Sequence, residues 1–79
     1  MKILVTGANG LLGQKLISLL TQKQEVHTIA TARKPVSYSL TKTEFRILDV
    51  TNQKETERVI LEVKPDVVKK IFSENFKTN

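Results

Sequence analysis

The chain has 79 residues, of which 39% are hydrophobic and 27% charged, with a formal net charge of +5. This length corresponds to one small domain or part of one, since single domains usually run to about 100 to 150 residues. Cysteine is absent, which excludes disulfides and thiolate metal sites, and we expect no metal site. No apolar run approaches the roughly 18 residues needed to span a membrane, so we expect a cytoplasmic protein.

The positive charge is spread along the chain. Residues 1–32 and 33–50 each contribute +2, and residues 51–79 contribute +1. Nucleic-acid-binding faces concentrate basic residues along one stripe, with interleaved aromatic side chains where the target is single-stranded. Because neither pattern occurs here, we expect no nucleic-acid partner, and the net charge is explained by solubility.

The first third of the chain predicts a strand followed by a helix. Residues 2–6 contain a short run that is apolar on both faces, as in a buried strand of a parallel sheet. From Gly10 onward, an amphipathic helix is indicated by Leu12, Leu16, Leu19 and Leu20, which recur at helical spacing. Residues 26–32 favour a second strand.

The rest of the sequence predicts a third strand, a second helix and a fourth strand. After a polar loop at residues 36–44, residues 45–50 favour a strand, and Asn52 with Glu55 fits a capping box that starts a helix. Pro65 ends that helix, and residues 66–68 begin a fourth strand. Right-handed crossovers then predict an α/β fold, a partial Rossmann fold with a parallel sheet in the order 3-2-1-4 and a helix on each face.

Residues 6–13, with the sequence Thr-Gly-Ala-Asn-Gly-Leu-Leu-Gly, join the first strand to the first helix. Gly7 permits a sharp turn, Gly10 lets the backbone approach a pyrophosphate, and Gly13 lets the helix pack closely on the strand. The free amides at the start of the helix then face the phosphates. A glycine triplet in this strand-helix-strand context indicates dinucleotide binding.

The Thr-Gly-x-x-Gly-x-x-Gly pattern resembles the extended short-chain dehydrogenase/reductases, which include nucleotide-sugar epimerases and reductases. Three segments are especially similar to the dTDP-4-dehydrorhamnose reductases: residues 1–10, residues 48–52 (Leu-Asp-Val-Thr-Asn) and residues 64–68 (Lys-Pro-Asp-Val-Val). The resemblance implies the NADP-binding N-terminal part of a nucleotide-sugar reductase of dTDP-rhamnose biosynthesis. The alternatives are a fragment of a nucleotide-sugar epimerase or dehydratase, and a non-catalytic cofactor-binding or regulatory module.

The resemblance also implies which residues hold the cofactor. Gly10, Leu11 and Leu12 contact its diphosphate, while Asp49 and Val50 hold the adenine; Asp49 has the alternative role of a turn or helix-dipole carboxylate. The full set of expected cofactor-binding residues is Gly7, Asn9, Gly10, Leu11, Leu12, Gly13, Arg33, Asp49 and Val50.

The end of the second strand bears on the choice of cofactor. NAD-binding folds usually carry an acidic residue there, which holds the ribose 2′-hydroxyl. This sequence has Arg33 and Lys34 instead, with no neighbouring carboxylate in the sequence. Because a guanidinium pairs with a 2′-phosphate, we expect NADP in preference to NAD, although NAD is the alternative cofactor. The alternative for Arg33 is that it is simply a solvent-exposed residue at the end of the strand.

Tyr38 and Lys42 have the spacing of the Tyr-x-x-x-Lys pair with which the resembled family protonates its substrate. In that family the pair lies on a later helix beyond the fourth strand, whereas here it falls in the loop after the second strand. We therefore assign no catalytic residue.

The resemblance ends at Val68, because the family continues its fourth strand with small and apolar residues whereas this chain continues with Lys69 and Lys70. Two lysines in a central parallel strand are also costly. We expect residues 1–68 to form the NAD(P)-binding Rossmann segment, and residues 69–79 to be a divergent tail not native to the fold, as in a truncated or frameshifted product. Without the Tyr-x-x-x-Lys pair and the sugar site, which would bind the nucleotide-sugar substrate in the full-length parent, this chain is expected to be inactive alone. Self-association through the open sheet edge is also expected.

Overall fold

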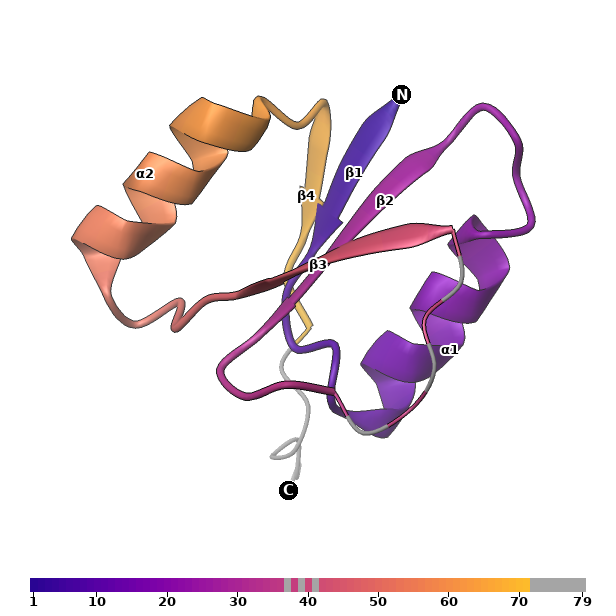
Figure 1. The fold of residues 1–79 in the computed structure, drawn as a ribbon, viewed down its shortest axis with the longest axis horizontal. Helices are drawn as coiled ribbons and strands as arrows, with labels where there is room; N and C mark the ends of the chain where they lie inside the picture. The colour runs from indigo at the N-terminus through magenta and orange to yellow at the C-terminus, as the bar shows by residue number, and fades with distance from the viewer. Residues whose placement is uncertain (37, 39, 41, 72–79) are drawn as a thin grey trace, which may run out of the picture.

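The computed structural model of the chain describes residues 1–36, 38, 40 and 42–71. Figure 1 shows four strands and two helices in the order β-α-β-β-α-β. Their bounds are β1 Lys2–Val5, α1 Leu11–Leu20, β2 His27–Ala32, β3 Thr43–Ile47, α2 Gln53–Val63 and β4 Val67–Lys69.

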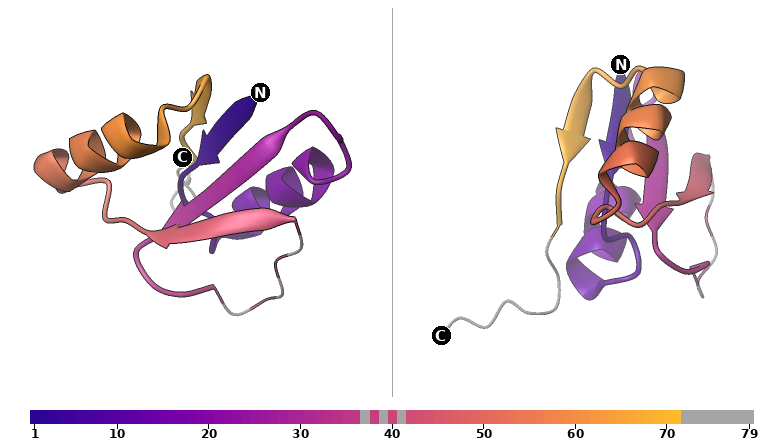
Figure 2. Two further views of the ribbon diagram at one scale, coloured as in Figure 1. Left: turned by 45° about the horizontal axis from the view of Figure 1, so that its top comes forward. Right: turned by 90° about the vertical axis from the view of Figure 1, so that its left-hand side faces the viewer.

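The four strands form one parallel sheet in the order β3-β2-β1-β4, which confirms the predicted topology. In the register of the sheet, Ile3 of β1 lies between Thr28 of β2 and Val67 of β4. Figure 2 shows β4 at one edge of the sheet and β3 at the other. Because every strand runs the same way, the carboxyl ends of all four lie along one side of the sheet.

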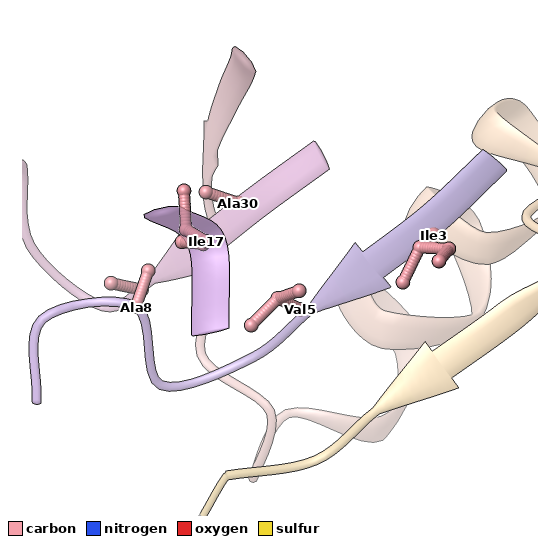
Figure 3. Packing of buried hydrophobic residues seen from close by; sticks show 6 residues of the cluster. Ile3, Val5, Ala8, Ile17 and Ala30 are labelled. Carbon is pink, nitrogen blue, oxygen red and sulfur yellow. The ribbon is translucent and has the colours of Figure 1, made fainter. Parts of the chain in front are cut away.

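Each face of the sheet is covered by one helix, as predicted (Figure 1). Successive side chains of a strand point to opposite faces, so β1 contributes to both cores. On the α1 side the buried cluster consists of Ile3, Val5, Ala8, Ile17, Ala30 and Ala32 (Figure 3). On the α2 side it consists of Leu4, Ile29, Leu48, Val59 and Val63.

The buried face of α1 differs from the predicted leucine stripe. Leu12 and Leu19 are exposed, while Gly13 and Ile17 are buried. The stripe that faces the sheet passes through Gly13, with Leu16, Ile17 and Leu20 at the following helical positions. The sequence prediction was wrong for Leu12 and Leu19 because it followed the largest apolar side chains, whereas the helix makes its close contact with the glycine turn through Gly13, which has no side chain.

The other elements are close to their predicted bounds. β3 begins at Thr43, two residues earlier than expected, and ends before Leu48, whose N–H still bonds to the carbonyl of Ala32 at 2.8 Å. α2 starts after Asn52, whose Oδ1 accepts from the Glu55 N–H at 3.0 Å. It ends at Val63, because Lys64 before the proline takes the left-handed conformation with φ of 54°.

β4 includes Lys69, the first residue of the segment expected to be a divergent tail. Lys69 pairs with Val5 in the sheet register, and its carbonyl accepts from the Thr6 N–H at 2.9 Å. Both Lys69 and Lys70 are exposed, because β4 has a neighbour on one side only among the described strands. The expected cost of burying two lysines in a central strand therefore does not arise here. Residues 72–79 of the expected tail lie outside the described residues.

Candidate functional site

The glycine-rich turn lies at the carboxyl end of β1, where the strand order reverses between β1 and β4. Open parallel sheets bind ligands at such switch points, outside the carboxyl ends of the strands. Gly7 has a φ of 71°, which disfavours any residue with a side chain, and its carbonyl accepts from the Gly10 N–H at 3.2 Å. The turn therefore needs its first glycine for the reason predicted from the sequence.

Gly13 brings α1 against this turn. A Cβ atom at Gly13 would overlap the carbonyl oxygen of Gly7 and would lie 3.0 Å from the Cα of Ala8. In Figure 3, Ala8 lies beside Ile17 of α1, at the end of the core nearest the turn. Helix and turn thus approach more closely than any other residue at position 13 would allow.

The start of α1 leaves backbone donors free for a ligand. The first bond within the helix joins the Gln14 N–H to the carbonyl of Gly10 at 3.0 Å, so the N–H groups of Leu11, Leu12 and Gly13 have no partner within the helix. Gly10 is the N-cap and offers no side-chain acceptor, and the first turn contains no acidic residue. The positive end of the helix dipole is therefore not neutralised by α1 itself, an arrangement that favours an anion.

Three hydrogen bonds hold the turn against β2 and the loop that follows it. The Ala8 N–H donates to the carbonyl of Thr31 at 3.0 Å, and the Asn9 Nδ2 donates to the carbonyl of Lys34 at 3.1 Å. On the other side of Ala8, its carbonyl accepts from the Tyr38 hydroxyl at 2.8 Å. The two residues between Gly7 and Gly10 are therefore fixed from both sides.

Thr31 and Tyr38 are structural partners of the site that the sequence analysis missed. Thr31 is fully buried, and its Oγ1 donates to the carbonyl of Val5 at 2.9 Å. Burial raises the pKa of Tyr38 above its ordinary value near 10, at which the phenol is already protonated and able to donate at neutral pH. The only sequence signal for Tyr38 was its spacing to Lys42, which concerned catalysis and not a bond to the turn.

Asp49 and Val50 follow β3 at the same side of the sheet. The Asp49 Oδ1 accepts from the Thr51 N–H at 3.0 Å and from the Thr51 Oγ1 at 2.6 Å. These bonds, and to a smaller extent the charge of Arg33, lower the pKa of Asp49. Asp49 thus takes the alternative role of a turn carboxylate, while its contact with an adenine stays a prediction.

Arg33 is exposed just beyond β2, and Val50 is 47% exposed. The sequence places no acidic neighbour beside Arg33, but the fold brings Asp49 from the next strand close enough for the two charges to interact. The predicted cofactor residues therefore fall into two groups along the sheet, one at the glycine turn and one formed by Arg33, Asp49 and Val50. Their roles in binding stay predictions.

A hollow in the described surface lies elsewhere. It has a volume of about 540 Å³ and is lined by residues that surround the amino ends of β2 and β3, among them Lys23, His27 and Glu44. It is at the opposite end of the strands from the glycine turn. Among the described residues there is no group of three potential metal ligands, and none of their helices is long and apolar enough to cross a membrane.

The parallel sheet and the glycine turn at its switch point define a Rossmann-type nucleotide-binding fold. Residues 3–75 match the model of the NAD dependent epimerase/dehydratase family, and the chain belongs to that family. No protein of curated function matches the sequence.

Three solved structures illustrate the similarity. The dTDP-glucose 4,6-dehydratase of Bacillus anthracis str. Ames, in complex with NAD, is 24% identical with a TM-score of 0.76, over 94% of this chain and 27% of that one. The L-threonine dehydrogenase of Clostridium difficile is 29% identical with a TM-score of 0.75, over 89% of this chain and 23% of that one. The UDP-glucuronic acid 4-epimerase of Bacillus cereus, in complex with UDP-glucuronic acid and NAD, is 23% identical with a TM-score of 0.68, over 90% and 26%. The chain thus spans about a quarter of the length of these proteins.

The described residues fit the cofactor of the family. A Cβ at Gly7 or Gly13 would overlap the chain's own backbone, so these glycines allow the compact turn that presents the start of α1. The free N–H groups of Leu11 and Leu12 there suit phosphate oxygens.

Proposed function

We propose that this chain is the cofactor-binding segment of an enzyme that acts on a nucleotide-linked sugar, and that it binds the diphosphate of a nicotinamide dinucleotide at the start of α1. The observation that carries the proposal is the set of free amides at Leu11, Leu12 and Gly13 behind an N-cap without a side chain. A bound dinucleotide supplies the hydride acceptor or donor. The residues of this chain hold its phosphates, and Gly10 leaves room for them to approach the backbone.

The adenosine half of the cofactor extends along the carboxyl ends of β2 and β3 in this proposal. Val50 packs on the adenine and Asp49 accepts a hydrogen bond from its amino group. Arg33 pairs with a 2′-phosphate, so we propose NADP in preference to NAD. Support comes from the charge of Arg33 and from the absence of an acidic residue at the end of β2, where NAD-binding folds usually carry one. The nearby Asp49 accepts hydrogen bonds from the N–H and the hydroxyl of Thr51.

Titration of the isotope-labelled 79-residue chain with NADP⁺ and NAD⁺, followed by amide NMR signals, tests cofactor binding. We expect both ligands to shift the signals of Gly10, Leu11 and Leu12, with NADP⁺ binding the more tightly. Inorganic phosphate at equal ionic strength is the control for a simple anion effect. Unchanged signals at millimolar cofactor in the folded chain would contradict the proposal, and equal affinities would remove the preference for NADP.

The substrate class rests on family membership. Two of the three similar structures, a dTDP-glucose dehydratase and a UDP-glucuronic acid epimerase, are named for sugar nucleotides. We propose a reductase similar to the dTDP-4-dehydrorhamnose reductases, on the sequence of residues 1–10, 48–52 and 64–68. An epimerase or dehydratase is supported equally well, since the chain belongs to a family named for those reactions.

Sequencing of the DNA downstream of codon 79, in all three frames, tests the enzymatic reading. A frame that encodes further strands and a Tyr-x-x-x-Lys helix is the expected result, and its sugar-site residues would separate a reductase from an epimerase. If no frame encodes them, the non-catalytic cofactor-binding module is favoured instead.

Sedimentation of the purified chain tests the proposed self-association through the free edge of β4, which should appear as a concentration-dependent increase in mass.

A further inference from the structure

The loop that carries Arg33 is fastened to the glycine turn at two points. The backbone carbonyl of Lys34 accepts a hydrogen bond from Asn9 Nδ2, and the Tyr38 hydroxyl donates one to the carbonyl of Ala8. Val36 and Leu40, from the same loop, pack against the core cluster under α1. Arg33 thus lies between Ala32, fixed in the sheet, and Lys34, fixed to the turn.

We propose that the Tyr38 hydroxyl is a positioning group that holds this loop against the glycine turn and thereby favours a cofactor that carries a 2′-phosphate. The inference rests on the proposed function, because it assigns the loop a role in the choice between NADP and NAD. Tyr38 touches neither the substrate nor the reacting atoms in this arrangement. It acts through the position of Arg33.

The effect falls on the loop more than on the turn, because the turn has a second support. The Ala8 N–H bonds to the carbonyl of Thr31 in β2, a contact that does not involve Tyr38. Loss of the Tyr38 hydroxyl therefore leaves the diphosphate-binding amides in place. It leaves the bond from Asn9 to the carbonyl of Lys34 as the remaining one of the two attachments, so that holding Arg33 against a phosphate then costs more conformational entropy.

The surroundings of Tyr38 suit this role. Its ring is half-buried, and its hydroxyl donates to a backbone carbonyl at 2.8 Å, which is the usual length of a well-formed hydrogen bond from a hydroxyl group. Its phenol is protonated over the physiological range at the ordinary tyrosine pKa, and burial raises that pKa further. Phenylalanine preserves the ring packing and removes only the donor, so Tyr38→Phe isolates the hydrogen bond.

The test compares the affinities of NADP⁺ and NAD⁺ for the unchanged chain, Tyr38→Phe and Thr56→Val, each by amide NMR titration, together with the thermal midpoint of each variant. Thr56→Val is the matched control: it removes a hydroxyl that donates to the carbonyl of Asn52 at 2.9 Å, on the opposite face of the sheet. For Tyr38→Phe we expect NADP⁺ to bind about threefold to tenfold more weakly and NAD⁺ to change by less than about twofold, the range of one hydrogen bond. Thr56→Val should leave both affinities unchanged.

If Tyr38 has a purely structural role, Tyr38→Phe lowers the thermal midpoint but leaves the ratio of the NADP⁺ and NAD⁺ affinities unchanged. That result overturns the inference and leaves the proposed function intact. If the unchanged chain binds neither cofactor, the proposed function itself fails, and this inference with it. A second measurement needs no variant: Tyr38 is the only tyrosine, so its ring signals are readily assigned. NADP⁺ should shift them more than NAD⁺ does, and equal shifts count against the proposal.

Discussion

The two helices of this fold begin in opposite ways. α2 begins after Asn52, whose side chain accepts the Glu55 N–H, and its first turn contains an acidic residue. α1 begins after Gly10, which has no side chain to offer, and its first turn contains no acidic residue. The chain thus caps the start of α2 with a side chain and leaves the first N–H groups of α1 without a side-chain acceptor.

The difference shows that an uncapped helix start is a local choice and not a general property of this sequence. Asparagine at an N-cap stabilises a helix by about 1 kcal/mol relative to alanine but by only a few tenths of a kcal/mol relative to glycine, so Gly10 leaves the amides free at little cost in stability. In α1 the omission coincides with a left-handed glycine and with a glycine that allows the closest helix-to-turn approach. These features together favour an anion at α1 and disfavour one at α2.

The largest expected effect is that of Gly13→Ala. The added Cβ overlaps the carbonyl oxygen of Gly7, which belongs to the backbone and has little freedom to move. We expect a loss of about 3 kcal/mol in the free energy of unfolding, measured by urea titration, and no detectable cofactor binding. Ser18→Ala, at an exposed position of the same helix, is the control and should change stability by less than about 0.5 kcal/mol. A stable Gly13→Ala variant that still binds cofactor would show that helix and turn do not need their close contact.

Gly10→Asn gives α1 the cap that α2 has. Gly10 has φ of −75° and ψ of 163°, which any residue adopts, so the change should alter stability by only a few tenths of a kcal/mol. The new side chain competes for the free amides, and we expect cofactor affinity to fall about tenfold or more in the same NMR titration, a loss of about 1.4 kcal/mol.

The reciprocal control is Asn52→Ala. It removes the cap of α2 and should cost about 1 kcal/mol in stability, with no change in cofactor affinity. If Gly10→Asn binds cofactor as well as the unchanged chain does, the contrast between the two helix starts has no functional meaning.

The same contrast between satisfied and unsatisfied groups occurs inside β2. Thr28 and Thr31 are both fully buried, but the Thr31 Oγ1 donates to the carbonyl of Val5, whereas the Thr28 Oγ1 has no partner among the described residues. Valine has the same shape without the hydroxyl. We expect Thr31→Val to lower the free energy of unfolding by about 1 kcal/mol and Thr28→Val to raise it by a similar amount. Effects of the same sign in urea titrations would refute this assignment.

The smallest effect concerns the ion pair that joins α2 to β3. Arg46 Nη1 lies 2.7 Å from Glu62 Oε1, and this hydrogen bond, aided by the charges of Arg46 and Arg58, lowers the pKa of Glu62 below its ordinary 4.5. The stabilisation is therefore present above about pH 4.5 and is lost as the pH falls through the lowered pKa. Thermal midpoints between pH 6 and pH 3 should fall less steeply for Glu62→Gln than for the unchanged chain. Glu57→Gln, whose described partner is the neutral Gln53, should leave the slope unchanged.

The fold was largely predictable, because hydrophobic periodicity and local stop signals act over a few residues. The capping asparagine and the proline at residue 65 marked the limits of α2 to within a residue. The buried face of α1 was not predictable in the same way. It depends on how closely the helix approaches the glycine turn, which is a property of the assembled structure and not of the spacing of leucines.

The site was predictable where it is continuous in sequence and not where distant segments meet. Gly7, Gly10 and Gly13 lie within seven consecutive residues, from the turn after β1 into the first turn of α1, so their spacing already indicated their geometry. The bond from Tyr38 to Ala8 and the approach of Asp49 to Arg33 depend on the order of strands in the sheet and on a loop conformation. No local sequence pattern predicts either contact.

The position of β1 has a consequence for how the molecule forms during synthesis. Of the four described strands β1 leaves the ribosome before the others, yet one of its two neighbours is β4, and Ile3 pairs with Val67. Closing so long a loop is entropically unfavourable and slows folding of topologies rich in distant contacts. β1 therefore stays half-paired until nearly the whole described chain has emerged.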